Sequence, residues 1–222
     1  MQDTVEPKNF PEGTFSLDQP LFGKWKINWE HVLLLALILA AILTRFWDLS
    51  HRSYNHDESI HTDWSWNLYT GRGYQHNPIY HGPLLYLATA LTFGLFGDND
   101  VTGRLPNALF GIVLVVLPYF FRKWLGTKGA LAASAMLLVS PAVLYYSRFN
   151  RHDIYVELFV VLIGLVIWKY FDDRREVWLY ASAALLALSY TAMETTFIFI
   201  FIFAEFLCAH FTFEYLRPRV KW

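Results

Sequence analysis

The sequence lacks most of the features that mark soluble enzymes. It has one cysteine in 222 residues, Cys208, so no disulfide can form within the chain. The formal net charge is −1, which gives no electrostatic footprint for nucleic acid. There is no Walker loop, no Cys/His zinc spacing, no Rossmann glycine pattern and no nucleophile elbow. These absences argue against a disulfide scaffold, a nucleic-acid binder and a nucleotide-dependent enzyme.

The N-terminal region also lacks the marks of a signal peptide. Residues 1–30 are polar and contain three prolines, and no small-residue cleavage site follows the first apolar run. We therefore expect residues 1–30 to be a cytoplasmic tail and the first apolar run to remain as a membrane anchor.

What the chain has in abundance is apolar surface. Hydrophobic residues make up 55% of it and aromatic residues 18%, which is typical of a polytopic membrane protein. Runs of near membrane-spanning length cover about 31–47, 105–121, 130–147, 154–171, 178–192 and 195–213. We expect an all-α membrane helical bundle with about six transmembrane helices, a transmembrane domain over 31–213 and a short cytoplasmic tail over 214–222.

A seventh apolar stretch, residues 82–97, is short for a membrane span. If it does not cross, twelve of the 18 Lys and Arg residues fall on the cytoplasmic side, as the positive-inside rule requires. If it crosses while the N-terminal tail stays inside, only six do. We therefore expect both termini to be cytoplasmic, and a long outer loop over 48–104 to carry this stretch as an interfacial helix.

A second interfacial helix is predicted within the same outer loop. Ile60, Trp64 and Leu68 recur every four residues in a segment without glycine or proline, which forms one apolar stripe suited to the headgroup region. On such a helix Asp57 and His61 share a face, one turn apart.

The acidic pair Asp57-Glu58 is the strongest local signal for chemistry. Carboxylates so close to a bilayer are costly to bury, so their position suggests a general base or a metal ligand, supported by His56 or His61. The alternative is a plain helix N-terminus, where acidic residues interact favourably with the helix dipole. Both interpretations fit the pair taken alone.

Cations and a further histidine are expected on the same outer side. Arg148 and Arg151 lie in a short charged loop, where guanidinium groups could clamp a lipid phosphate or only meet lipid headgroups. His81 precedes a proline-led helix start, which explains Pro83 without any function for the histidine.

Three ionisable residues lie within or between the last apolar runs. Glu194 falls at a tight turn and is either an exposed carboxylate or a supporting residue of the site. Glu205 and His210 lie inside the last run, and each is expected to pair with a group on another helix.

Taken in order, these motifs resemble a known family. The acidic pair after the first span is followed by His81-Gly82-Pro83-Leu84, by Gly103-Arg104-Leu105-Pro106-Asn107, by Tyr145-Tyr146-Ser147-Arg148, and by Arg151-His152-Asp153. The set is similar to the GT-C membrane glycosyltransferases, in the group of protein O-mannosyltransferases and lipid A aminoarabinose transferases. It is most similar to a bacterial and archaeal branch described as flippase-activity-associated, over about residues 30–200.

The resemblance implies a function and roles for several residues. The family uses a polyprenyl-phosphate-linked sugar as donor on the outer face of the cell membrane. By resemblance, Asp57 with Glu58 acts as base toward the acceptor or helps to hold the acceptor or a metal. Asp153 corresponds to the family's acid after the third span, and His81 lies near the donor phosphate. A divalent metal could be held by Asp and His ligands, but the resemblance demands no cofactor.

The resemblance also leaves alternatives open. Family members run to roughly twice this length or more, so the chain looks like an N-terminal half that would need a C-terminal half or a partner subunit. The alternatives to a transferase are a non-catalytic or transport-accessory protein that binds a lipid-linked sugar, and an inactive fragment of the enzyme.

Overall fold

The computed structural model describes residues 17, 20–22, 25–75 and 77–216. Its elements, in chain order, are β1 (Pro20–Phe22), β2 (Trp25–Asn28), α1 (Trp29–Phe46), α2 (His56–Tyr69), the 3-10 turn η1 (Pro78–Tyr80), α3 (Leu84–Phe96), α4 (Asp100–Val116), the 3-10 turn η2 (Leu117–Phe121), α5 (Arg122–Val139), α6 (Pro141–Tyr146), α7 (Asp153–Asp173), α8 (Glu176–Ala192) and α9 (Thr196–Leu216). The predicted all-α membrane bundle is confirmed.

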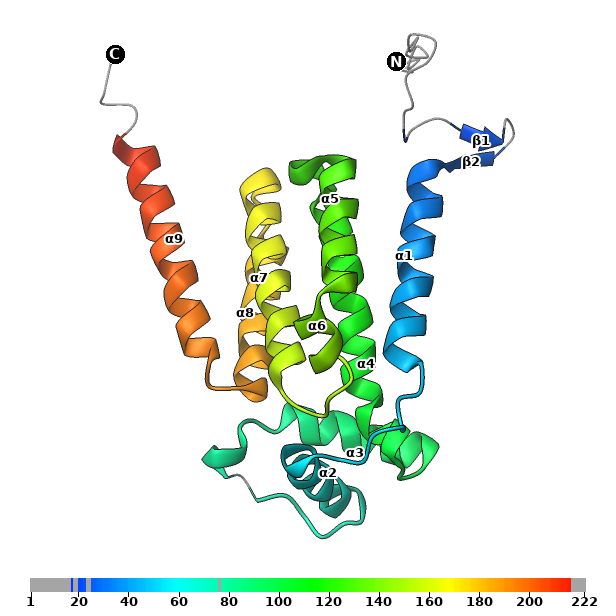
Figure 1. Cartoon of the computed structure of the whole chain (residues 1–222). Helices are drawn as coiled ribbons and strands as arrows, with labels where there is room; N and C mark the ends of the chain where they lie inside the picture. Colours follow the sequence, from blue (N-terminus) through cyan, green and yellow to red (C-terminus); the bar gives the residue numbers. More distant parts are fainter. Residues whose placement is uncertain (1–16, 18–19, 23–24, 76, 217–222) are drawn as a thin grey trace.

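The expected spans correspond to helices that run side by side in the bundle. By length and composition, α1, the continuous stretch Asp100–Val139, α7 and α9 can each cross a membrane. The 17 residues of α8 give a helix about 26 Å long, close to the thickness of the hydrocarbon core. The start of α1 and the end of α9 lie at one end of the bundle, and α2 and α3 lie across the other, called here the α2–α3 end (Figure 1).

The stretch Asp100–Val139 folds back on itself instead of forming one long span. Gly126 has φ 69° and ψ 161°, a backbone conformation that residues other than glycine rarely adopt. It interrupts α5 after its first turn and so separates α4 from the rest of α5. A second interruption at Ser140 (ψ 120°) divides the predicted span 130–147 into α5 and α6. The residue before a proline avoids helical backbone, which explains this break before Pro141.

Part of the predicted tails lies outside the described residues. The hairpin of β1 and β2, in which Phe22 pairs with Trp25, occupies the end of the segment expected to be a polar tail over 1–30. The tail expected over 214–222 is helical as far as Leu216, and residues 217–222 are not described.

Both helices predicted in the outer loop form. Trp64, from the apolar stripe of α2, packs among the rings of Tyr74, Tyr80 and Tyr86, with centroid distances of 6.1, 5.5 and 6.3 Å. This residue of the stripe therefore packs against η1, α3 and the segment between α2 and η1. Helix α3 crosses the end of the bundle and ends at Gly97, which has φ 83° (Figure 1).

The apolar core lies between α3, α4, α6 and α7. Its members include Leu85, Leu114, Val143, Ile154, Tyr155 and Phe159. This core joins α3 to the bundle, so the α2–α3 end is held on packed helices.

Candidate active site

A pocket of about 310 Å³ opens at the α2–α3 end, between α2, η1 and the loop before α7. Most of the residues singled out in the sequence line it. The lining consists of His56, Asp57, Ile60, His61, Ile79, Tyr80, His81 and Arg151. We call it the Asp57 pocket.

Asp57 lies in the first turn of α2 and keeps access to solvent. Its side chain is 44% exposed, and Oδ2 accepts a hydrogen bond from Nη1 of Arg151 at 3.2 Å. Nε of Arg151 lies 3.2 Å from Oδ2 of Asp153, the first residue of α7. Arg151 thus lies between two carboxylates, and the predicted pair Asp57 and Asp153 is brought together through it.

Glu58 has a different environment from its neighbour, because it is fully buried. Its carboxylate forms a two-pronged ion pair with Arg104, with nitrogen to oxygen distances of 2.8 and 3.1 Å. It also accepts hydrogen bonds from Nη2 of Arg52 and from the backbone N–H groups of Asn55 and Asn150. Burial acts to raise the pKa of Glu58, but these hydrogen bonds outweigh it and hold the pKa below its usual value.

The Glu58 contacts join three parts of the chain. Asn55 and Glu58 form a capping box that starts α2, in agreement with the helix N-terminus considered from the sequence. Arg104 belongs to α4, and Asn150 belongs to the loop before α7. Glu58 therefore fixes the position of α2, and with it Asp57, relative to the bundle.

His81 reaches the pocket from the segment before α3. It has a positive φ of 66°, and its Nδ1 lies 2.7 Å from Oε2 of Glu194 in the turn between α8 and α9. The neighbouring backbone packs closely: Gly82 N–H donates to the carbonyl of Ala192 at 3.2 Å, and a Cβ on Gly82 would lie 2.1 Å from the carbonyl oxygen of Thr191. Only glycine permits this approach, which places the predicted residues His81 and Glu194 in contact.

Two buried histidines support the pocket. The hydroxyl of Tyr86 donates its proton to the carbonyl of Tyr80 at 2.6 Å, so Nδ1 of His61, 3.0 Å away, must be the donor to that hydroxyl. Nε2 of His152 donates to the carbonyl of Gly82 at 3.1 Å. Each ring can make its contact in the neutral form.

The pKa values of both histidines agree with neutral rings. Burial, together with the neighbouring His81, lowers the pKa of His61 to about 4. Burial, together with the neighbouring His61, lowers the pKa of His152 to about 3.

Arg148 does not line the Asp57 pocket, contrary to its predicted grouping with Arg151. Its Nη1 and Nη2 donate to the carbonyls of Thr44 and Asp48 at 3.0 and 3.1 Å, at the end of α1. Arg148 instead lines a second pocket, which is described below. The two arginines diverge because the loop turns between them, and Phe149 is buried at that point.

Sequence reasoning missed several residues that build the site. The sequence motifs included Arg104 and His152 without assigning them a role, and Arg52 was not considered. Arg104 and Arg52 bind Glu58, and the ring of His152 contacts the ring of His61. An arginine at the start of an apolar helix was the available signal, because a buried charge requires a partner. Among the described residues, no three His, Cys, Asp or Glu side chains are placed to hold a metal ion.

Comparisons with known proteins bear on residues of this site. A family profile described as dolichyl-phosphate-mannose-protein mannosyltransferase matches residues 80–222, a range that includes His81, Arg151 and Asp153. An uncharacterized protein of Aquifex aeolicus (strain VF5) is 25% identical over 166 residues, which are 69% of this chain and 33% of that protein. The chain thus spans about a third of the length of this relative. No solved structure is significantly similar to it.

The matched range, residues 80–222, covers more than half of the chain. The chain therefore belongs to the dolichyl-phosphate-mannose-protein mannosyltransferase family, a group of GT-C-like membrane glycosyltransferases.

Proposed function

We propose that the protein transfers a sugar from a polyprenyl-phosphate-linked donor to an acceptor hydroxyl, on the extracytoplasmic face of the cell membrane. The family's description supports a lipid-phosphate sugar as the donor. The observation that carries the proposal is the Asp57 pocket, which combines one accessible carboxylate with Arg151 and His81 at one end of a membrane bundle. Such a site can activate an acceptor and bind a phosphate at once.

Asp57 is the proposed general base. In the transfer step the acceptor oxygen forms a bond to the anomeric carbon of the sugar, and its proton passes to the Asp57 carboxylate. The bond between the anomeric carbon and the phosphate oxygen breaks, and the lipid phosphate leaves with that electron pair. Phosphate is already a good leaving group, so the step requires no general acid.

Arg151 and His81 are the proposed contacts of the lipid phosphate. A guanidinium group suits the planar recognition of phosphate oxygens, and a cation stabilises the charge that grows on the leaving group. Asp153 and Glu194 would orient these two residues through the contacts at 3.2 and 2.7 Å. A bound phosphate would replace Asp57 as a partner of Arg151, which frees the carboxylate to act as base.

Glu58 is proposed to position Asp57 rather than to react. Its carboxylate is fully buried and hydrogen-bonded to Arg104, Arg52 and two backbone N–H groups. A group enclosed in this way cannot approach an acceptor without loss of the ion pair. His56 and His61 line the same pocket and remain candidates for binding the sugar hydroxyls.

Further membrane helices are proposed to cover α9, from a C-terminal half or a partner subunit. Only 6% of the apolar window of α9 is buried, compared with 44% in α7. Glu205 lies near the middle of α9, is exposed, and makes no ion pair with any other described residue, whereas His210 packs on Phe171 at 4.7 Å. A carboxylate at that depth requires a polar or basic partner, which a neighbouring helix would supply.

Sugar transfer is tested with polyprenyl-phosphate-linked mannose labelled in the sugar. Membranes from cells that express the chain should release polyprenyl phosphate and move the label into a lipid-free fraction. Matched membranes without the chain provide the background. Parallel assays with polyprenyl-phosphate-linked glucose and N-acetylglucosamine, each labelled in the sugar, show which sugar is transferred. Donor consumption equal to background with every sugar would contradict the proposal.

A further inference from the structure

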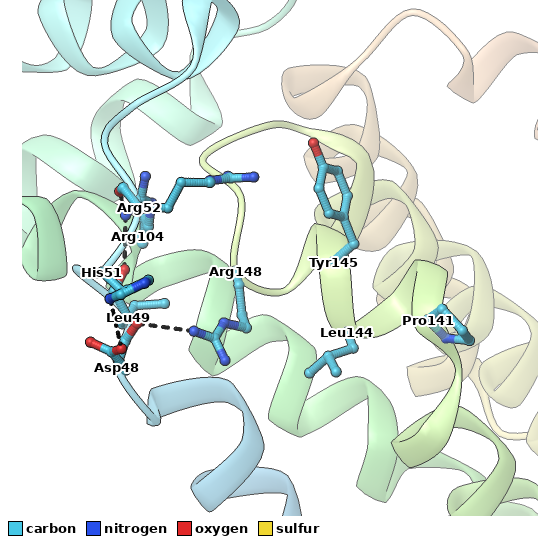
Figure 2. A pocket seen from close by; sticks show the side chains of 9 residues that line it. All are labelled: Asp48, Leu49, His51, Arg52, Arg104, Pro141, Leu144, Tyr145 and Arg148. Atoms are coloured by element: carbon cyan, nitrogen blue, oxygen red, sulfur yellow. Dashed lines mark hydrogen bonds and ion pairs between the residues drawn. The ribbon is translucent and has the colours of Figure 1, made fainter.

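A second pocket, of about 410 Å³, lies at the α2–α3 end between the segment after α1, the start of α4 and helix α6. We call it the arginine pocket, after the guanidinium groups of Arg52, Arg104 and Arg148 that line it. Figure 2 shows Arg52 extending toward Tyr145 of α6, and Arg148 lying between Leu144 and Asp48 with its guanidinium turned toward Asp48. The proposed sugar transfer takes place in the Asp57 pocket and does not use this second pocket.

The arginines of this pocket differ in how far their charge is neutralised. Arg104 is 1% exposed and its guanidinium is fully engaged with Glu58 and with backbone carbonyls. Arg52 is half exposed, and only its Nη2 contacts the carboxylate of Glu58, which Arg104 also binds. Arg148 donates to backbone carbonyls and, within the described part of the chain, forms no ion pair with a carboxylate. Two carboxylates lie at the pocket, those of Glu58 and Asp48, and the Asp48 carboxylate is 3.2 Å from Nδ1 of His51. Three guanidinium groups and two carboxylates leave one positive charge in excess.

The other wall of the pocket is apolar. Pro141, Leu144 and Tyr145 form this wall. Helix α1 ends immediately before the pocket, and Trp47 at its end is 68% exposed, as expected for an aromatic residue at a membrane interface. A ligand here would place a charged group on the arginines and an apolar chain along α6.

We propose that the arginine pocket binds the phosphate ester of a membrane lipid, with Arg148 and Arg52 as the contacts of the phosphate oxygens. Guanidinium groups match phosphate geometry through paired N–H donors, and the uncompensated charge suits one anion. Glu58 lies between this pocket and the Asp57 pocket, since it binds two of the three lining arginines, Arg52 and Arg104, and the N–H of Asn150 beside Arg151. The proposed site is thus separate from the one assigned to the reacting donor phosphate.

This inference does not depend on sugar transfer, and its test measures binding without turnover. Purified full-length chain in detergent is titrated with dioctanoyl phosphatidylglycerol, farnesyl phosphate, inorganic phosphate and the phosphate-free dioctanoylglycerol. Binding is followed as the ligand-dependent rise in unfolding temperature. We expect both lipid phosphates to bind, and Arg148→Gln to weaken that binding by about tenfold. Arg174→Gln, at the opposite end of the bundle, serves as the matched control and should bind as the unaltered chain does.

A second variant covers the case in which Arg148→Gln does not fold. Leu144→Trp leaves every arginine contact in place and fills the pocket from its apolar wall, so it should weaken both lipid phosphates to a similar extent. Inorganic phosphate that competes in the same way would identify the phosphate group itself as the recognised feature. Equal binding by the unaltered chain and both variants, or equal binding of dioctanoylglycerol, would overturn the proposal.

Discussion

At the scale of single residues, the two members of the acidic pair perform different tasks because their surroundings differ. Asp57 is half exposed and faces a pocket, whereas Glu58 is buried and saturated with hydrogen bonds. The side chains of consecutive residues on a helix point about 100° apart, so one can face the solvent while the next faces the core. The chemistry of the pair depends on this division.

The buried ion pair gives the first prediction. Arg104→Gln removes the main partner of a fully buried carboxylate and should lower the free energy of unfolding by about 3 kcal/mol, because an unpaired buried charge is costly. Unfolding in detergent, followed by circular dichroism, measures the loss. Arg72→Gln, an exposed arginine at the same end, should change stability by less than about 0.5 kcal/mol. A loss for Arg104→Gln no larger than this control would contradict the structural role of Glu58.

The buried histidines predict an acid-sensitive fold. The pKa values of His61 and His152 are lowered to about 4 and about 3, whereas in the unfolded chain both lie near 6.5. Between pH 6.5 and 4 the unfolded chain binds protons that the folded chain does not, so stability is lost as pH falls through this window. Unfolding temperatures between pH 7 and 5 check this.

The variant His152→Gln isolates the histidine effect in the same measurement. A glutamine amide can still donate to the carbonyl of Gly82 but does not titrate. We expect its unfolding temperature to fall less steeply with decreasing pH than that of the unaltered chain. Identical slopes for the two proteins would show that His152 is not held neutral by the fold.

At the scale of elements, much of the fold was predictable from the sequence. Every expected span is helical, although 105–121 ends in η2 and 130–147 is divided between α5 and α6. The short stretch 82–97 lies across the bundle end, and these outcomes were predictable because apolar length and glycine or proline boundaries are local properties. The pairing of Glu58 with Arg104, 46 positions away, was not predictable. It depends on how α2 and α4 pack, which no local pattern reports.

The site was predictable to a similar degree. Asp57, His81 and Arg151 meet in one pocket. The family resemblance pointed to Asp57 and His81, and charge and position pointed to Arg151. Arg148, expected beside Arg151, lines the other pocket instead, because the two loop residues between the arginines turn its side chain away. The roles of these residues in catalysis stay predictions.

The break within Asp100–Val139 gives a prediction at this scale. Gly126→Ala places a side chain at φ 69° and ψ 161°, and should destabilise the fold by about 1–3 kcal/mol. Gly164→Ala is the matched control, because Gly164 is helical in α7 and has open space around it. We expect that control to be neutral or slightly stabilising in the same unfolding experiment. Equal effects of the two substitutions would argue against the reversal at Gly126.

At the scale of the whole molecule, the orientation of the bundle decides which lipid leaflet the Asp57 pocket faces. Twelve of the 18 Lys and Arg residues lie at the end opposite the pocket or in the tails, which favours an extracytoplasmic pocket. The single cysteine allows a direct check. In a Cys208→Ser background, Thr70→Cys should react with a membrane-impermeant maleimide on intact cells, and Arg174→Cys should react only after permeabilisation. The reverse pattern would place the pocket on the cytoplasmic side.

The size of the molecule also bears on its function. The chain spans about a third of its Aquifex relative, and α9 exposes the carboxylate of Glu205 near its middle. Both observations support the proposal that more helices pack against α9, and neither affects the Asp57 pocket, which is formed by α2, η1 and the loop before α7.

Asp57 is proposed to be the base of the sugar transfer, and the rate of transfer from polyprenyl-phosphate-linked mannose by Asp57→Asn tests this role most directly. Asp63→Asn, an exposed aspartate on the same helix, controls for the loss of a carboxylate. The account predicts that Asp57→Asn lowers the rate by at least about 100-fold without loss of folded protein, while Asp63→Asn transfers at the unaltered rate. Transfer by Asp57→Asn at the same rate as Asp63→Asn would contradict it.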